Sequence, residues 1–169
     1  MSDDLLHELA DRLSNRFFGK YRGVVTDVDA ATMRIRATVP AVLGEAPSGW
    51  CQPCVPYAGP QVGFFFLPEP GTGVWIEFEA GDVSYPIWSG CFWHAGEVPA
   101  EAAATVRGIV TAAPHQLLFD DDSDEVTLAD SNGGSVLLNS DGVTLSRASM
   151  TVVVADAKVS VNDGALEVT

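Results

Sequence analysis

Apolar residues alternate with other residues in short runs along most of the chain, and turn residues separate the runs. Residues 74–79 (VWIEFE) alternate in this way and are rich in β-branched and aromatic types, which is typical of a half-buried strand. Residues 80–82 (AGD) predict a turn, and residues 86–93 (PIWSGCFW) predict a second strand. Pro86 fits the first position of that strand because its missing N–H breaks no ladder hydrogen bond there. With the tight loop predicted at residues 68–73 (PEPGTG), the pattern predicts a strand, a short turn and a strand.

Two further alternating runs precede this unit. Residues 21–29 (YRGVVTDVD) and 33–39 (MRIRATV) are joined by three small or polar residues, so they predict a β-hairpin. Alternation places Arg34 and Arg36 on one face of the second strand, which we expect to be the solvated face. The other face carries Met33, Ile35 and Ala37.

The N-terminal segment has the period of a helix. Within residues 3–18, one stripe carries Leu5, Leu6, Leu9, Leu13 and Phe17, and Gly19 is a plausible stop signal. Such a helix either caps the rest of its own domain or docks onto a partner.

The C-terminal part repeats a simpler pattern, an apolar residue, any residue, and an apolar residue. Each triplet predicts a strand of about three to five residues with apolar groups on one face only, and several are separated by Asn-Gly or Asp-Gly turns. Strands this short form no stable core alone, so we expect three copies to wind around a common axis, with a sandwich edge or a single-chain solenoid as alternatives. The expected trimer core consists of Val126, Leu128, Val136, Leu138, Val143, Leu145, Val152, Val154, Val159, Val161, Leu166 and Val168.

Net charge limits the possible partners. The chain has a formal net charge of −14, which repels nucleic-acid phosphates, so we expect no nucleic-acid partner. No apolar run approaches the roughly 20 residues that span a bilayer, and the N-terminus is acidic where a signal peptide is basic. Synthesis in the cytoplasm is the expectation.

The stretch from Leu67 to Gly90 resembles the OB-fold domain in the central spike of contractile injection systems. That family includes phage baseplate assembly protein V and the VgrG spike of type VI secretion. Its pattern is roughly L-P-x-x-G-x-x-V-x-V-x-F-x-x-G-D-x-x-x-P-x-x-x-G. Ten residues of this chain fall in register with it: Leu67, Pro68, Gly71, Val74, Ile76, Phe78, Gly81, Asp82, Pro86 and Gly90.

The resemblance is strong over residues 21–93. Over residues 106–169 it is confined to the general pattern of short repeated strands. It implies an all-β protein. We expect an N-terminal helix at residues 1–19, an OB-fold domain at 20–93 and a linker at 94–105. Residues 106–169 would form a triple-stranded β-helix, the needle of a homotrimer.

The cysteines offer two kinds of chemistry. Residues 50–54 (WCQPC) match the sequence motif of a thioredoxin active site. That site needs a helix after the first cysteine, but prolines and a glycine follow here, so we expect no redox role. Cys51, Cys54, Cys91 and His94 could together ligate a structural zinc ion. The competing interpretation is that the cysteines are small buried hydrophobic residues, and we expect no metal and no cofactor. The acidic residues 120–125 predict a solvated turn rather than a calcium site.

The resemblance implies a non-enzymatic puncturing spike of a phage tail or phage-tail-like particle. Such a spike sits on a hub protein of the baseplate and is driven through a target membrane when a sheath contracts. The chain has no histidine after His115, so the end at Leu166, Val168 and Thr169 is expected to be blunt and to carry a PAAR-type tip protein. The alternatives are an OB-fold module that binds oligosaccharide or nucleic acid, and a zinc-stabilised β protein.

Overall fold

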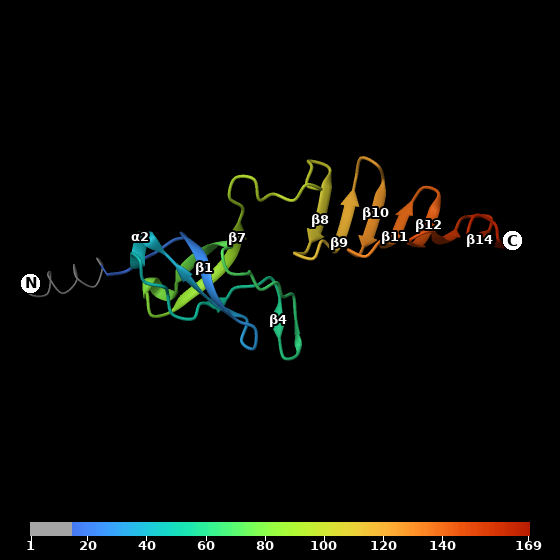
Figure 1. Ribbon diagram of the computed structural model, residues 1–169. Coiled ribbons are helices and arrows are strands. Elements are labelled where there is room, and N and C mark those ends of the chain that lie inside the picture. The colour runs from blue at the N-terminus through green and yellow to red at the C-terminus, as the bar shows by residue number, and fades with distance from the viewer. Residues whose placement is uncertain (1–14) are drawn as a thin grey trace, which may run out of the picture. The chain divides into compact units, whose positions relative to one another are not determined.

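Strands make up most of the regular structure in residues 15–169, the part of the chain that the computed structural model describes (Figure 1). They form two units, one ending at Glu97 and one beginning at Val98. Most of the helix expected at residues 3–18 lies outside the described residues. The described residues 15–18, its expected last turn, are not helical, so this part of the prediction is wrong. Among residues 15–169, no helix is long and apolar enough to cross a membrane.

The first unit is built on a curled, OB-like sheet in the order β2-β1-β6-β7-β3. Its strands are β1 (Tyr21–Asp29), β2 (Arg34–Thr38), β3 (Gln52–Pro53), β6 (Gly73–Phe78) and β7 (Pro86–Phe92). The antiparallel pairs β1–β2 and β6–β7 confirm the hairpin and the strand–turn–strand predicted from the alternation. The parallel pairing of β3 with β7 is a long-range contact that the pattern did not predict. The unit also contains α2 (Pro40–Leu43), η1 (Glu79–Gly81), β4 (Ala58–Gly59) and β5 (Val62–Gly63).

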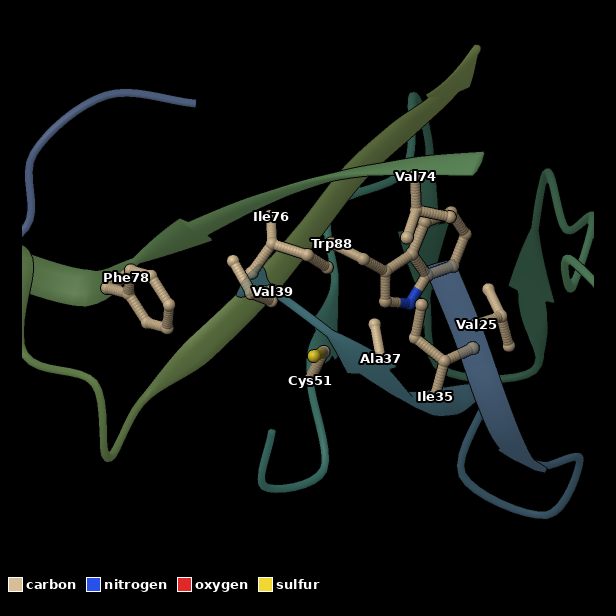
Figure 2. Packing of buried hydrophobic residues seen from close by; sticks show 9 residues of the cluster. All are labelled: Val25, Ile35, Ala37, Val39, Cys51, Val74, Ile76, Phe78 and Trp88. Carbon is tan, nitrogen blue, oxygen red and sulfur yellow. The ribbon is translucent and has the colours of Figure 1, made fainter. Parts of the chain in front are cut away.

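One set of alternating residues forms the core of this unit. Ile35 and Ala37 are fully buried, as the alternation in β2 predicts. The remaining members come from β1, β6, β7 and the segments next to β2 and β3, and Figure 2 shows their side chains gathered together. The core consists of Val25, Ile35, Ala37, Val39, Cys51, Val74, Ile76, Phe78 and Trp88.

The two arginines of β2 are not simply solvated. Arg34 is exposed, but its guanidinium donates a hydrogen bond of 2.9 Å to the side-chain oxygen of Gln52. Arg36 is half-buried, and its guanidinium carbon lies 4.7 Å from the centre of the Trp50 ring, a cation–π geometry. Both contacts reach the segment that contains β3, so this face helps to hold β3 against β2.

The turn between β6 and β7 explains the Gly-Asp pair of the motif. Gly81 is buried and has a φ of 78°, a conformation that glycine adopts without a steric cost. The Asp82 carboxylate accepts a hydrogen bond of 3.0 Å from the backbone N–H of Ser84. This hydrogen bond lowers the pKa of Asp82, with a smaller contribution from the charge of Arg16.

The second unit is a single antiparallel sheet in which eight strands follow one another in chain order (Figure 1). The apolar triplets predicted in the C-terminal part lie on six of these strands, β10 to β15. The strands are β8 (Val106–Val110), β9 (Gln116–Asp120), β10 (Glu125–Ala129), β11 (Gly134–Asn139), β12 (Gly142–Arg147), β13 (Met150–Val154), β14 (Val159–Val161) and β15 (Leu166–Val168).

Two adjacent valines of β1 test the assignment of the OB-fold core. The Val25 side chain is 2% exposed, whereas Val24 is 37% exposed. Val25→Ala should lower the free energy of unfolding by about 2 kcal/mol, because it removes buried methyl groups and leaves a cavity. Val24→Ala makes the same chemical change at the surface and should change it by less than about 0.5 kcal/mol. Urea unfolding of this unit, followed by tryptophan fluorescence, measures both, because all four tryptophans of the chain lie in this unit. Equal effects would contradict the assigned faces.

Candidate functional site

The apolar residues of the C-terminal sheet stand in two columns on one face. Residues two apart on a strand point to the same side of the sheet, and the register places each against an apolar residue of the next strand. Val126 lies opposite Leu138, and Leu128 lies opposite Val136. The first column contains Phe119, Val126, Leu138, Val143, Val154, Val159 and Val168. The second contains Ile109, Leu117, Leu128, Val136, Leu145, Val152, Val161 and Leu166.

Within the part of the chain that the structure describes, nothing buries these columns. None of the twelve residues expected to form a trimer core is buried; six are half-buried and six are exposed. The exposed fractions of Leu128, Leu166 and Val168 are 54%, 60% and 61%. A continuous apolar band of this length marks a surface that another protein covers. The site of this unit is therefore an association surface.

The opposite face of the sheet is less polar than the triplet pattern predicts. Its central column carries the middle residues of the triplets, and three of its members are apolar. The expectation that apolar groups occupy one face only is wrong at Leu137 and Val153, because the middle position of these two triplets is also apolar and points to the opposite face. The full column is Leu118, Thr127, Leu137, Thr144, Val153, Ser160 and Glu167.

Charged residues of this unit gather at strand ends and turns. Asp130 accepts hydrogen bonds from the backbone N–H groups of Gly134 at 2.7 Å and Asn132 at 2.9 Å, and it pairs with Arg147 at 3.0 Å. The bond from Gly134 is the main reason that the pKa of Asp130 is lowered. Lys158 pairs with Glu167 in the same way on the surface. Asp130 thus fixes the turn before β11, and no acidic side chain enters either apolar column.

The acidic residues 120–125 form a turn between β9 and β10. The Asp120 carboxylate accepts a hydrogen bond of 3.0 Å from the backbone N–H of Asp122, which lowers the pKa of Asp120. Across the described residues 15–169, no three His, Cys, Asp or Glu side chains come together in a way that could hold a metal ion. The carboxylates of this turn are therefore not arranged as a calcium site.

The four candidate zinc ligands are likewise not brought together as a ligand set. Cys51 is fully buried in the OB-fold core, and its sulfur lies 3.2 Å from the hydroxyl oxygen of Ser48. Burial raises the pKa of the Cys51 thiol, which is the opposite of what a redox-active cysteine requires. Cys54 and Cys91 are exposed, so the interpretation of a buried hydrophobic residue fits Cys51 and is wrong for Cys54 and Cys91.

Comparison with protein families identifies both units. The family model of the type VI secretion system/phage-baseplate injector OB domain matches residues 21–93. The family model of the phage baseplate V C-terminal trimerisation domain matches residues 108–167. No curated protein matches the chain in sequence.

These matches confirm the resemblance carried by the motif between Leu67 and Gly90. The curled sheet of the first unit is an OB domain, and the second unit belongs to a domain family that associates as a trimer. Both families are structural components of the baseplate and not enzymes. The exposed apolar columns thus lie on a trimerisation domain, and the chain belongs to the family of phage baseplate V spike proteins.

Proposed function

We propose that three copies of this chain form the puncturing spike of a contractile injection machine, with residues 106–168 wound as a triple-stranded β-helix. The observation that supports this most directly is the pair of apolar columns, which run through consecutive strands and have no cover in one chain. In a prism of three sheets, each column faces the common axis. A fully buried Val or Leu side chain contributes about 1.5–3 kcal/mol relative to an exposed one, so association is strongly favoured.

The dimensions suit a needle. Eight strands stacked at about 4.8 Å span roughly 35 Å along the axis. Ladder hydrogen bonds join each strand to the next along that direction, so a load on the tip is resisted by the whole ladder. The proposed action is mechanical: the OB domain seats on a hub protein, and sheath contraction drives the needle through the target membrane.

The far end of the sheet is the proposed seat of a PAAR-type tip protein. Among the described strands, β15 pairs only with β14, so one row of its backbone groups is free for pairing. Leu166 and Val168 on β15 are among the more exposed residues of the columns. An apolar tip protein of matching threefold symmetry would cover both. We further propose that the chain is made in the cytoplasm and joins the particle there.

The first test is the mass of the particle in solution. Native mass spectrometry of the purified full-length chain should give three chains per particle. A stable monomer whose residues 106–168 are folded would refute the trimeric spike, because a folded monomer would show that the columns tolerate water.

A lysine scan of two neighbouring residues tests which face meets the axis. Val161 lies opposite Val152 and Leu166, whereas Ser160 lies opposite Val153 and Glu167. Val161→Lys should lower the melting temperature of the needle strongly at neutral pH, because an unpaired buried charge costs several kcal/mol and threefold symmetry repeats it. Ser160→Lys places the same charge next to the Glu167 carboxylate and should leave stability within about 0.5 kcal/mol of the unsubstituted protein.

The pH dependence gives this experiment a second readout. Desolvation lowers the pKa of a buried lysine, so the neutral amine forms at a lower pH than it does in water. The melting temperature of Val161→Lys, followed by circular dichroism, should partly recover as the pH is raised. A lower melting temperature for Ser160→Lys than for Val161→Lys would show that the assigned faces are reversed, and equal melting would show that the two faces do not differ in burial.

Two substitutions on β15 test the tip proposal. Leu166→Ser combined with Val168→Ser should abolish co-purification with a PAAR-type protein encoded beside this chain, while native mass spectrometry still shows a trimer. Glu167→Gln lies between them on the other face and should retain the tip protein. If the unsubstituted spike fails to retain that protein, the proposed seat is wrong.

A further inference from the structure

A short hairpin in the OB domain carries an aromatic surface that the core does not use. We call residues 57–66 the aromatic hairpin. Its strands β4 and β5 pair antiparallel around a turn in which Gln61 has a φ of 62°, and the Phe64 N–H donates to the Tyr57 carbonyl at 2.9 Å. Figure 1 shows this hairpin projecting away from the curled sheet of the same unit.

The large side chains of the aromatic hairpin are exposed. Phe65 is the most exposed at 72%, and Phe64 and Phe66 contact one another with ring centroids 4.9 Å apart. None of these side chains is among those buried in the core or packed against it. The exposed set is Tyr57, Val62, Phe64, Phe65 and Phe66. So many aromatic groups on one small projection mark a surface that another molecule covers.

The aromatic hairpin and the chain on either side of it carry no charged residue of their own. Residues 46–68 contain no Asp, Glu, Lys or Arg, although 19% of the whole chain is charged. A partner that binds by charge complementarity needs charged residues in the patch, and the hairpin has none. An anionic membrane surface would repel a chain with a net charge of −14. Copies of this chain repel one another for the same reason. They can meet closely only where charge is absent, and the hairpin is such a place.

The trimerisation domain brings the copies together. Residues 93–105 join β7 to β8, so each OB domain of a trimer is tethered to two others. Tethers of this kind raise the local concentration to about the millimolar range, which makes a modest apolar contact effective. Because the C-terminal domain already holds the copies together, the molecule that covers the hairpin is the OB domain of a second copy.

A threefold ring needs a second, different surface on each copy, because the contact runs from head to tail. A groove of about 560 Å³ lies on the OB domain between the loop at residues 69–72 and the end of β7. Pro70, Phe92 and Trp93 line it, and Trp93 is 65% exposed. Glu69 and Glu97 also line the groove, and an uncharged hairpin is not repelled by these acids.

We propose that, in the trimer, the aromatic hairpin of each protomer packs into the Trp93 groove of the next protomer. This inference rests on the proposed trimeric spike and adds a second interface to it. Trimerisation then extends from the needle into the OB domains, so the three domains form a closed collar and not three independent bodies on flexible tethers.

Photo-crosslinking of the full-length chain tests the contact directly. We expect p-benzoyl-phenylalanine in place of Phe65 to give covalent dimers and trimers on irradiation, with the attachment mapped near Trp93. Trp93→Ser in the same chain should reduce that yield at least severalfold, and Trp93 is exposed enough that its loss leaves the OB core intact. The matched control replaces Tyr85, a 62% exposed aromatic residue in a turn, and should give no link between chains.

Two further measurements separate the possible outcomes. Phe65→Ser should lower the melting temperature of the OB domain within the trimer by several degrees, whereas Tyr85→Ser should leave it unchanged. A trimer that gives only links within one chain, and whose melting temperature is insensitive to Phe65→Ser, would overturn this inference alone. Attachment to phospholipid vesicles in place of protein would overturn it in favour of membrane insertion. A monomeric mass would refute the proposed trimeric spike itself.

Discussion

An antiparallel sheet of eight short strands with an uncovered apolar face is the feature on which the rest of this protein depends. Short strands gain little from their own ladder, and their stability comes from burying one face against another layer. Among the described residues 15–169, no second layer covers the columns that contain Val143, Val152 and Val161. We therefore expect folding of this unit and association of copies to be one process, as in an obligate oligomer.

The OB domain meets the same requirement in a different way. Its sheet curls so that alternate residues from β1, β2, β6 and β7 meet in a closed cluster, and Ile35, Val74 and Ile76 are fully buried. This unit has a core of its own and can hold a fixed shape without help. An OB domain with its own core, joined to a trimerisation domain whose apolar face is open, suits the proposed spike.

The net charge limits which surfaces of either unit can associate. With −14 on each chain, association has to proceed through surfaces from which charge is absent. The apolar columns and the aromatic hairpin both satisfy this condition. The columns hold no acidic side chain, and residues 46–68, which include the hairpin, contain no charged residue. Acidic groups such as Asp120 and Asp130 instead fix turns by accepting backbone hydrogen bonds.

The sequence by itself determined the strands, the turns and the family. Period-two alternation and Gly, Pro, Asn and Asp turns are local properties, so the β1–β2 hairpin, the β6–β7 unit and the six C-terminal strands could be read directly. Ten residues at fixed offsets were specific enough to indicate the spike family, which the family matches confirm.

Only the tertiary structure decided how distant segments meet. The register between strands aligned the columns and revealed Leu137 and Val153 on the opposite face. Cys51 and Cys54 are three residues apart, yet β3 pairs with β7 so that one is buried and the other exposed. The aromatic hairpin was also missed, because whether a phenylalanine enters a core depends on what packs over it, and that partner is distant in the chain.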